Sequence, residues 1–354
     1  ASVGFFSYKS DDTYEAIAYQ LDPLGSIPLT SLPNTDPNPD LFVDKTEAVF
    51  AQIGLDLLDK RLKFNLEGRY AESDKSVETI GIANTAAAAT FYAFTPRLTI
   101  DYTLTPGHLL YGSFAQGIKA GGFNSPILAN SGRPVDPSQA TYKDESNWTY
   151  EIGSKNTFLD GRLLANLAVY FIDWTDLQIS ATAVNGGPQD PVQIDNIGGA
   201  TTYGAEFESI WNATDAVRLN LGLSYSNPTF DKGIIYIEAA SDNWCDGVVC
   251  PVDGDIGGNT LNRVPKLQGN LGAQYSGNTT AGNTYYVRGD VTYQSKQYME
   301  LLNVGWVPER TLFNARAGYT GGEGTWEVSL WAKNLLDKKY VSNSLFLGFS
   351  NGYV

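Results

Sequence analysis

The chain has 354 residues, of which 42% are hydrophobic, and a formal net charge of −15. So acidic a chain lacks the basic face that nucleic acid requires, and we expect no nucleic-acid partner. No window approaches about 18 uninterrupted apolar residues, which excludes transmembrane helices. Two cysteines, one methionine and one histidine leave little material for a metal or redox centre, and we predict no metal site.

Runs of alternating apolar and polar residues predict β-strands throughout the chain. The predicted strands cover residues 3–8, 47–57, 62–70, 94–104, 109–118, 148–157, 163–177, 203–211, 217–225, 265–275, 284–294, 311–319 and 326–334. These are about 13 strands of roughly ten residues each, the length that a tilted strand needs to cross a bilayer. The chain is therefore predicted to be all-β.

The hairpin formed by residues 265–294 shows the pattern most clearly. Leu271 and Val291 belong to apolar rows, whereas Asn270 and Thr292 belong to the polar rows between them. A soluble sandwich would turn the apolar rows toward a second sheet, and a membrane barrel would turn them toward lipid. This hairpin alone does not decide between the two.

The links between the predicted strands decide in favour of the barrel. They alternate between short turns, such as residues 58–61, and long polar segments, such as residues 10–42 and 73–90. Outer-membrane barrels have this asymmetry, with short periplasmic turns and long external loops. Aromatic residues near strand ends fit a girdle at the lipid interface: Tyr170, Phe171, Trp174, Tyr203 and Trp211. A soluble protein of several sheets is the alternative.

In a barrel, the polar faces of the strands line the lumen. This predicts a lining of mixed charge: Lys63, Arg69, Arg97, Asp101, Glu151, Lys155, Glu206, Glu208, Arg218, Lys266, Arg288, Asp290, Arg316, Glu327 and Lys333. Mixed signs indicate pairs that compensate one another on the wall, with a path for a charged substrate as the alternative.

The sequence offers little for catalysis. His108 lies in a short turn, where we interpret it as a turn residue, and Gly112-Ser113-Phe114 does not complete a nucleophile elbow. The glycine-rich residues 117–123 lack the following helix of a phosphate cradle, so they are predicted to be the base of a flexible loop. We therefore predict that the protein is not an enzyme.

Two long external links carry further features. Cys245 and Cys250 lie in one of them, and export through an oxidising periplasm predicts that they form a disulfide. Both links are acidic, which we interpret mainly as solvation; bridging by Ca²⁺ to lipopolysaccharide, or attraction of cationic ligands, is the alternative. The acidic residues are Asp11, Asp12, Glu15, Asp22, Asp36, Asp40, Asp44, Glu238, Asp242, Asp246, Asp253 and Asp255.

Four motifs together resemble the TonB-dependent receptors of the bacterial outer membrane. They are Leu110-Tyr111-Gly112-Ser113-Phe114 continuing to Asn124, Tyr150-Glu151-Ile152-Gly153-Ser154-Lys155, residues 196–208, and Asn334-Leu335-Leu336-Asp337-Lys338-Lys339-Tyr340. The resemblance implies a Gram-negative outer-membrane barrel of 22 strands, filled by an N-terminal plug that contacts TonB. Plug and closing strand are missing from the match, so we expect residues 1–354 to be part of a larger barrel protein.

The resemblance also implies energy-coupled import of a scarce, bulky nutrient: a ferric siderophore, a cobalamin or a glycan. TonB, with ExbB and ExbD, would supply the energy through the plug, and outer-membrane lipid would surround the wall. A passive porin and a surface protein that binds but does not transport are the alternatives. Basic, aromatic and amide side chains in external links are the predicted substrate ligands: Lys119, Asn124, Arg133, Lys143, Trp244, Tyr298, Trp306 and Arg310.

Overall fold

The computed structural model describes residues 1–14, 17–18, 34–35, 40–81, 83, 85–124, 141–182, 192–235 and 254–342. Its main element is one antiparallel sheet of 13 strands, which confirms the predicted all-β fold and strand number. Among the described residues, no helix is long and apolar enough to cross a membrane. The strands of the sheet, in their order across it, are β1 (Ser2–Tyr14), β4 (Asp40–Leu57), β5 (Leu62–Thr79), β6 (Ala87–Thr105), β7 (His108–Lys119), β10 (Glu145–Phe158), β11 (Leu163–Thr182), β12 (Val192–Asn212), β13 (Val217–Phe230), β14 (Leu267–Asn278), β15 (Thr284–Gln294), β18 (Arg310–Gly321) and β19 (Trp326–Ala332).

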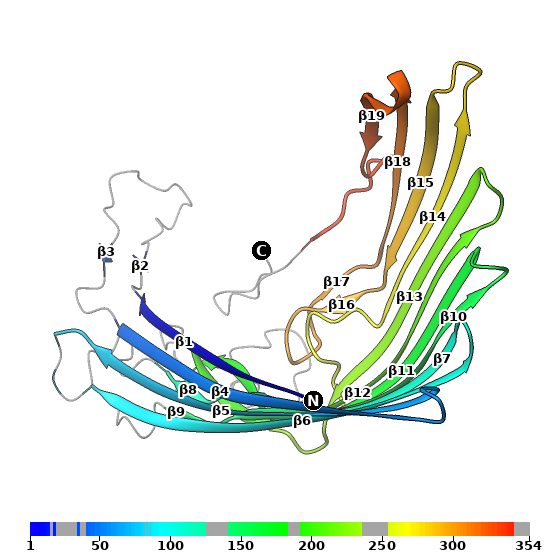
Figure 1. The fold of residues 1–354 in the computed structure, drawn as a ribbon. Helices are drawn as coiled ribbons and strands as arrows, with labels where there is room; N and C mark the ends of the chain where they lie inside the picture. Colours follow the sequence, from blue (N-terminus) through cyan, green and yellow to red (C-terminus); the bar gives the residue numbers. More distant parts are fainter. Residues whose placement is uncertain are drawn as a thin grey trace, which may run out of the picture.

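The sheet curves into an open trough (Figure 1). Each strand pairs with its neighbours in the chain, and β1 and β19 form the two edges of the described sheet. Three two-stranded ribbons accompany it. They are formed by β2 (Ile17–Ala18) with β3 (Asn34–Thr35), β8 (Gly122–Phe123) with β9 (Thr141–Tyr142), and β16 (Gln297–Tyr298) with β17 (Trp306–Val307). A 3-10 turn, η2 (Gly322–Gly324), connects β18 to β19.

The short turns lie along one rim of the trough, and most of the long links lie along the other (Figure 1). Two of the turns share a pattern in which consecutive residues have positive φ and the following arginine reaches the next turn. Arg61 donates to the carbonyl oxygen of Leu104 at 2.8 Å, and Arg162 donates to that of Ala213 at 2.6 Å. These arginines tie adjacent turns together at the rim.

Several strands are longer than the predicted ten residues. β11 has 20 residues and β12 has 21, and β5 continues to Thr79, so that only residues 80–86 separate it from β6. The long link predicted for residues 73–90 is therefore wrong. Outside the lipid layer the outward-facing side chains become polar. The alternation of apolar and polar residues therefore ends before the hydrogen bonding between the strands does.

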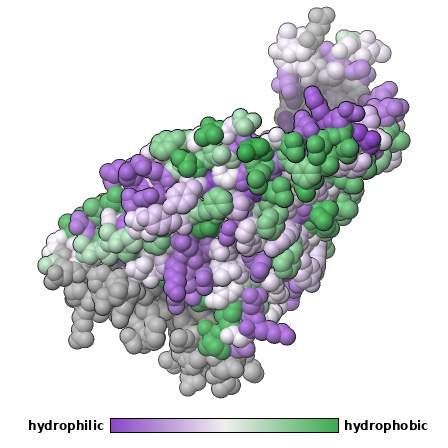
Figure 2. All heavy atoms as spheres, turned by 60° about the horizontal axis from the view of Figure 1, so that its bottom comes forward, coloured by the Kyte–Doolittle hydropathy of each residue, from purple (hydrophilic) through white to green (hydrophobic). Residues whose placement is uncertain are grey.

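The register gives the sheet an outer apolar face and an inner polar face. Leu271 pairs with Val291 on the outer face, where its side chain is 52% exposed, whereas Asn270 pairs with Thr292 on the inner face. Figure 2 brings the underside of the curve forward and shows hydrophobic residues gathered across it. These exposed apolar rows are what a wall surrounded by lipid requires.

Outer-facing aromatic rings lie near both ends of the apolar rows. Tyr203 and Trp211 begin and end one such row on β12, and Tyr203 lies 6.4 Å from Tyr225 on the next strand. Tyr170 and Trp174 were predicted to belong to this girdle, but the register places them on the inner face, opposite Gly204 and Ala200. The prediction was wrong because adjacent residues such as Tyr170 and Phe171 face opposite sides of a strand.

The main buried apolar cluster of the described residues lies where β11, β12 and β13 meet the long-link rim. Its buried members are Leu177, Ala200, Phe230, Ile234, Ile256 and Leu301. Ala200 and Phe230 face inward from the sheet, and Ile256 and Leu301 come from the links that follow β13 and β15. These links therefore fold onto the inner face near that rim, rather than extending away from it.

Candidate functional site

The charged residues predicted for the lumen share the inner face of the sheet. The pairings of Arg69 with Phe50, Glu151 with Ser113 and Glu206 with Ser224 belong to the same set of inner rows. Counted outward from these pairs, the register puts eight of the predicted lumen residues on this face: Arg69, Glu151, Lys155, Glu206, Glu208, Arg288, Asp290 and Arg316. Lys333 directly follows β19, and its ammonium lies 5.6 Å from the centre of the Trp331 ring.

One group on this wall connects β13 and β15 across β14. Arg288 donates from Nε to Oδ2 of Asp290 at 2.9 Å and from Nη2 to Oδ1 of Asn220 at 2.8 Å. Between the two strands lies Gly272, where a Cβ would come within 3.0 Å of all three side chains. The glycine thus leaves room for an ion pair whose two charges neutralise each other on the wall.

A second group lies on β7 and β10. Tyr111 donates to Oε1 of Glu151 at 2.7 Å, and the ammonium of Lys155 lies 5.4 Å from the centre of the tyrosine ring. The ring covers Gly153, whose missing side chain leaves it room. Tyr111 thus contacts both a carboxylate and an ammonium on the inner face.

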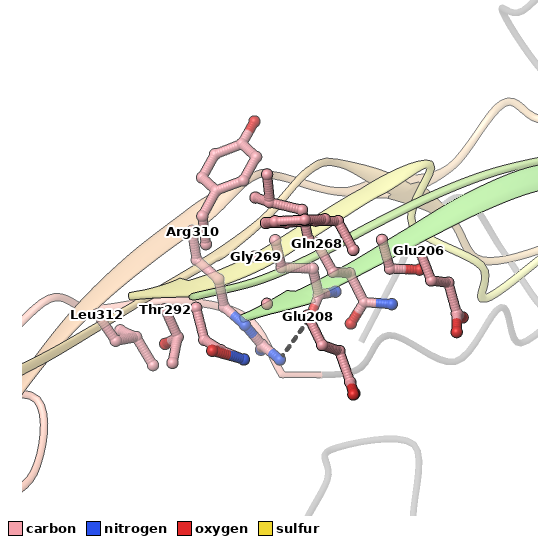
Figure 3. Close-up of a pocket in the computed structure, with 14 residues that line it drawn as sticks. Glu206, Glu208, Gln268, Gly269, Thr292, Arg310 and Leu312 are labelled. Atoms are coloured by element: carbon pink, nitrogen blue, oxygen red, sulfur yellow. Dashed lines mark hydrogen bonds between the residues drawn. The ribbon is translucent and has the colours of Figure 1, made fainter. Parts of the chain in front are cut away.

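A shallow pocket of about 460 Å³ crosses β12 to β18. One row of inner-face residues runs across it, from Glu206 through Ser224, Gln268 and Gln294 to Arg310. Arg310 donates to Oε1 of Gln294 at 2.9 Å, and Figure 3 shows its side chain on the same side of the sheet as those of Glu206 and Glu208. The row has a carboxylate at one end, a guanidinium at the other, and a hydroxyl and two amides between, which suits a polar, hydrated partner.

Residues 295–309, which contain β16 and β17, form a feature that we call the mouth hairpin. It lies inside the curve of the sheet near the long-link rim (Figure 1). Lys296 donates to the hydroxyl of Tyr298 at 3.3 Å, and its ammonium lies 6.0 Å from the centre of the Trp306 ring. Trp306 is 58% exposed. The structure thus brings together two of the predicted ligands, Tyr298 and Trp306, with a lysine that the sequence did not single out.

Paired main-chain and side-chain hydrogen bonds hold the mouth hairpin in place. Asn303 accepts from the amide of Thr260 at 2.8 Å and donates to the carbonyl oxygen of the same residue at 2.8 Å. The side chain of Asn259 donates to the carbonyl oxygen of Leu301 at 3.0 Å, and the amide of Arg263 donates to that of Tyr298 at 2.6 Å. Together with the apolar contacts of Leu301, these bonds position Tyr298 and Trp306 relative to the wall.

Within the hairpin, the carboxylate of Glu300 accepts from the amides of Leu302 at 2.6 Å and Gly305 at 2.7 Å. Burial raises the pKa of the Glu300 carboxyl above its ordinary value of 4.5, and these amide hydrogen bonds oppose the rise only in part. Because burial shifts the pKa of this carboxyl, docking of the hairpin should depend on pH.

We expect docking of the mouth hairpin to weaken as the pH rises. A carboxyl whose pKa is raised in the docked state holds its proton more tightly there than in the undocked state. The protonated carboxyl therefore stabilises the docked state. This stabilisation is complete below pH 4.5 and is lost as the pH rises from 4.5 through the raised pKa of Glu300. Hydrogen exchange at the amides of Leu302 and Gly305, corrected for its intrinsic pH dependence, measures the effect. Glu300→Gln should remove it, and protection that stays flat across the titration in the native protein would contradict it.

The other predicted ligands have different surroundings. The side chain of Asn124 accepts from the amide of Ile194 at 2.7 Å and donates to its carbonyl oxygen at 2.8 Å, so this amide joins two links. Lys119 pairs with Glu145 in the sheet, and the main chain of Lys143 bonds with the side chain of Asn196. Arg133, Trp244, Cys245 and Cys250 lie outside the described residues.

The acidic residues do not converge in the described ranges. There, no group of three or more His, Cys, Asp or Glu side chains could hold a metal ion. Asp40 accepts from the hydroxyl of Thr79, and Asp44 pairs with Lys75 at 3.3 Å. The bridging by Ca²⁺ considered from the sequence stays a hypothesis.

Comparisons with known proteins agree with this architecture. Residues 3–335 match the family model described as TonB dependent receptor-like, beta-barrel. The probable TonB-dependent siderophore receptor PiuA of Acinetobacter baumannii is 24% identical over 251 residues, which are 69% of this chain and 30% of PiuA. A ferric-pyoverdine 358 receptor of Pseudomonas putida is 32% identical over 114 residues, which are 32% of this chain and 13% of that protein.

A solved structure shows the same fold. The ferric yersiniabactin uptake receptor FyuA of Yersinia pestis superposes with a TM-score of 0.72 at 16% identity, covering 99% of this chain and 47% of FyuA. The chain thus spans about half the length of that receptor.

A curved antiparallel sheet with an apolar outer face, a charged inner face and links folded into its mouth is the wall of an outer-membrane β-barrel. The chain belongs to the family of TonB-dependent receptors. Proteins of this family are receptors in the outer membranes of Gram-negative bacteria.

Proposed function

We propose that the full-length protein imports a ferric siderophore with energy supplied through TonB. The observation that carries this proposal is the docked mouth hairpin, which presents Lys296, Tyr298 and Trp306 at the long-link rim, inside the curve of the wall. Ferric siderophore complexes are bulky and often anionic. An exposed indole and phenol supply stacking area, and the ammonium supplies complementary charge.

The relatives support the substrate class. PiuA, the ferric-pyoverdine 358 receptor and FyuA are each named for siderophores or ferric chelates. The partner that supplies energy would be TonB, working with ExbB and ExbD.

The proposal predicts a large loss of affinity when the exposed indole is removed. Trp306→Ala in the full-length protein should weaken binding of its ferric siderophore by about 30-fold, the effect of removing an aromatic anchor worth about 2 kcal/mol. Lys296→Ala should weaken it by about fivefold, because its interaction with an exposed partner is worth about 1 kcal/mol. Binding is measured by fluorescence quenching with ferric pyoverdine and ferric yersiniabactin as the first probes.

Trp326→Ala is the matched control, since Trp326 is also an exposed indole (50%) but lies beside the short turn between β18 and β19. Equal losses in Trp306→Ala and Trp326→Ala would show a general effect of removing tryptophan. Unchanged affinity in Trp306→Ala would remove the mouth hairpin from the binding site.

A further inference from the structure

Aromatic and cationic side chains gather on the inner face of β15, β18 and β19. Trp331 pairs with Arg316 in the ladder, so its indole faces the lumen beside that guanidinium, and it is 67% exposed. The guanidinium of Arg316 lies 5.7 Å from the centre of the Tyr286 ring, and the ammonium of Lys333 lies 5.6 Å from that of Trp331. We call Tyr286, Arg316, Trp331 and Lys333 the inner-wall cluster.

The inner-wall cluster lies away from the mouth hairpin, toward the short-turn rim. Tyr286 is the third residue of β15, directly after the short turn from β14. Arg316 is three residues before Tyr319, whose ring lies 5.6 Å from that of Trp326 where the outer apolar rows end at this rim. β15 and β18 connect this rim to the mouth hairpin (Figure 1). A molecule that enters at the mouth hairpin therefore meets the inner-wall cluster later on its way to the periplasm.

The inner-wall cluster repeats the chemistry of the mouth hairpin. In the hairpin, the ammonium of Lys296 lies 6.0 Å from the centre of the exposed Trp306 ring, and a tyrosine completes the group. The inner-wall cluster likewise holds an exposed indole, a phenol and an ammonium, and it adds the guanidinium of Arg316. A negatively charged ligand with flat rings would find complementary groups at both positions.

The cluster has a net positive charge. Arg316 forms a long ion pair with Glu327, whose carboxylate lies 4.0 Å away, and both side chains are half exposed. In the described ranges Lys333 takes part in no ion pair. Arg288, which lies opposite Arg316 in the ladder, pairs with Asp290 and so adds no net charge. One positive charge therefore remains on this part of the inner wall.

We propose that the inner-wall cluster is a second, exit-side subsite, which holds an anionic ferric chelate with aromatic arms after it leaves the mouth. This inference rests on the proposed function and adds a position to the path of the same substrate. The two rings supply stacking area, and the unneutralised cation supplies complementary charge. An acidic segment of another part of the full-length protein is the other occupant that such a surface could take, but it would need the cations alone.

The test separates transport from binding in cells that carry the full-length protein. Arg316→Gln and Trp331→Ala should each lower the maximal rate of energised uptake of radiolabelled ferric yersiniabactin or ferric pyoverdine by about fivefold, the effect expected for one exposed cation–ring contact. The affinity of de-energised cells, which reports the mouth, should stay unchanged. Arg316→Lys keeps the charge and Trp331→Phe keeps a ring, so both should retain most of the rate.

Trp326→Ala is the matched control, because it removes an exposed indole from the outer face of the same strand and should leave the rate unchanged. Heat-modifiable migration in gels shows that each variant is folded. Unchanged maximal rates in Arg316→Gln and Trp331→Ala would overturn the proposal. So would passive entry of vancomycin in these variants, which would assign the cluster to holding another domain inside the barrel. Failure of the proposed function is a different result, in which the native protein itself binds no chelate or accumulates it without the proton-motive force.

Discussion

Leu271→Arg should lower the free energy of unfolding by about 2–4 kcal/mol, the cost of placing a cation on the lipid face near the midplane of a barrel. Leu271 lies at the middle of an outer row that begins at Leu267 and ends at Tyr275, and it pairs with outer residues on both sides, Leu221 and Val291. Neither partner has a polar side chain that could pair with an arginine at this position.

The matched substitution is Thr292→Arg, one residue along from Val291 on β15. Thr292 faces the inner side, in the pocket that also contains Arg310, where water can solvate a new charge. Equilibrium unfolding of the full-length protein in lipid vesicles, followed by tryptophan fluorescence, compares the two. Equal costs would contradict the assignment of faces and with it the barrel wall.

Gly272→Ala should cost about 1–3 kcal/mol, although it adds only one methyl group. The new Cβ would overlap the side chains of Asn220, Arg288 and Asp290, so the hydrogen bonds that Arg288 makes must lengthen or break. The expected cost is that of leaving partly buried, charged partners unsatisfied.

Gly289→Ala is the control for this substitution. Gly289 is in the neighbouring strand, β15, and a Cβ there would meet nothing within 4 Å. Alanine should therefore be neutral, or stabilise by the smaller entropy of the unfolded chain. Urea unfolding of both variants measures the difference, and a cost at Gly272→Ala no larger than that at Gly289→Ala would show that the inner-wall network does not need the glycine.

Much of the fold was predictable because a strand that separates lipid from water carries its own pattern. Apolar residues such as Leu271 and polar ones such as Asn270 alternate, and this alternation gives both the strand and its two faces. The ends of the strands were not predictable in this way. β12 includes residues 192–202, which lie outside the lipid layer. There, no difference between lipid on one face and water on the other imposes an alternation of apolar and polar residues.

The mouth was harder to predict than the wall. Asn303 bonds with Thr260, and Asn124 with Ile194, 43 and 70 residues away in the chain. Such pairs leave no local periodicity, and an asparagine in a link looks like any turn residue. Asn124 was predicted as a substrate ligand, and its sequence neighbourhood gave no sign of the hydrogen bonds between its amide and the main chain of Ile194. Lys296 was missed because only the folded hairpin brings it to Tyr298 and Trp306.

The proposed energy-coupled import needs an inner wall that holds a hydrated domain by weak contacts. In the described part of the wall, Arg288 is paired with Asp290, and the row from Glu206 to Arg310 offers many weak polar contacts. Such a surface can hold a hydrated domain inside the barrel without locking it. The mouth hairpin, fixed by Asn303 and Leu301, lies inside the curve of the wall near the long-link rim, where the proposed substrate would first be captured.

Uptake of radiolabelled ferric siderophore by cells that carry the full-length protein, with and without a protonophore, tests this account most directly. The outer membrane has no ATP, so accumulation against a gradient must draw its energy from the inner membrane. We predict saturable uptake that is absent from a deletion strain and collapses when the proton-motive force is dissipated. Uptake that persists without the proton-motive force and rises linearly with concentration would contradict the account and identify a passive porin.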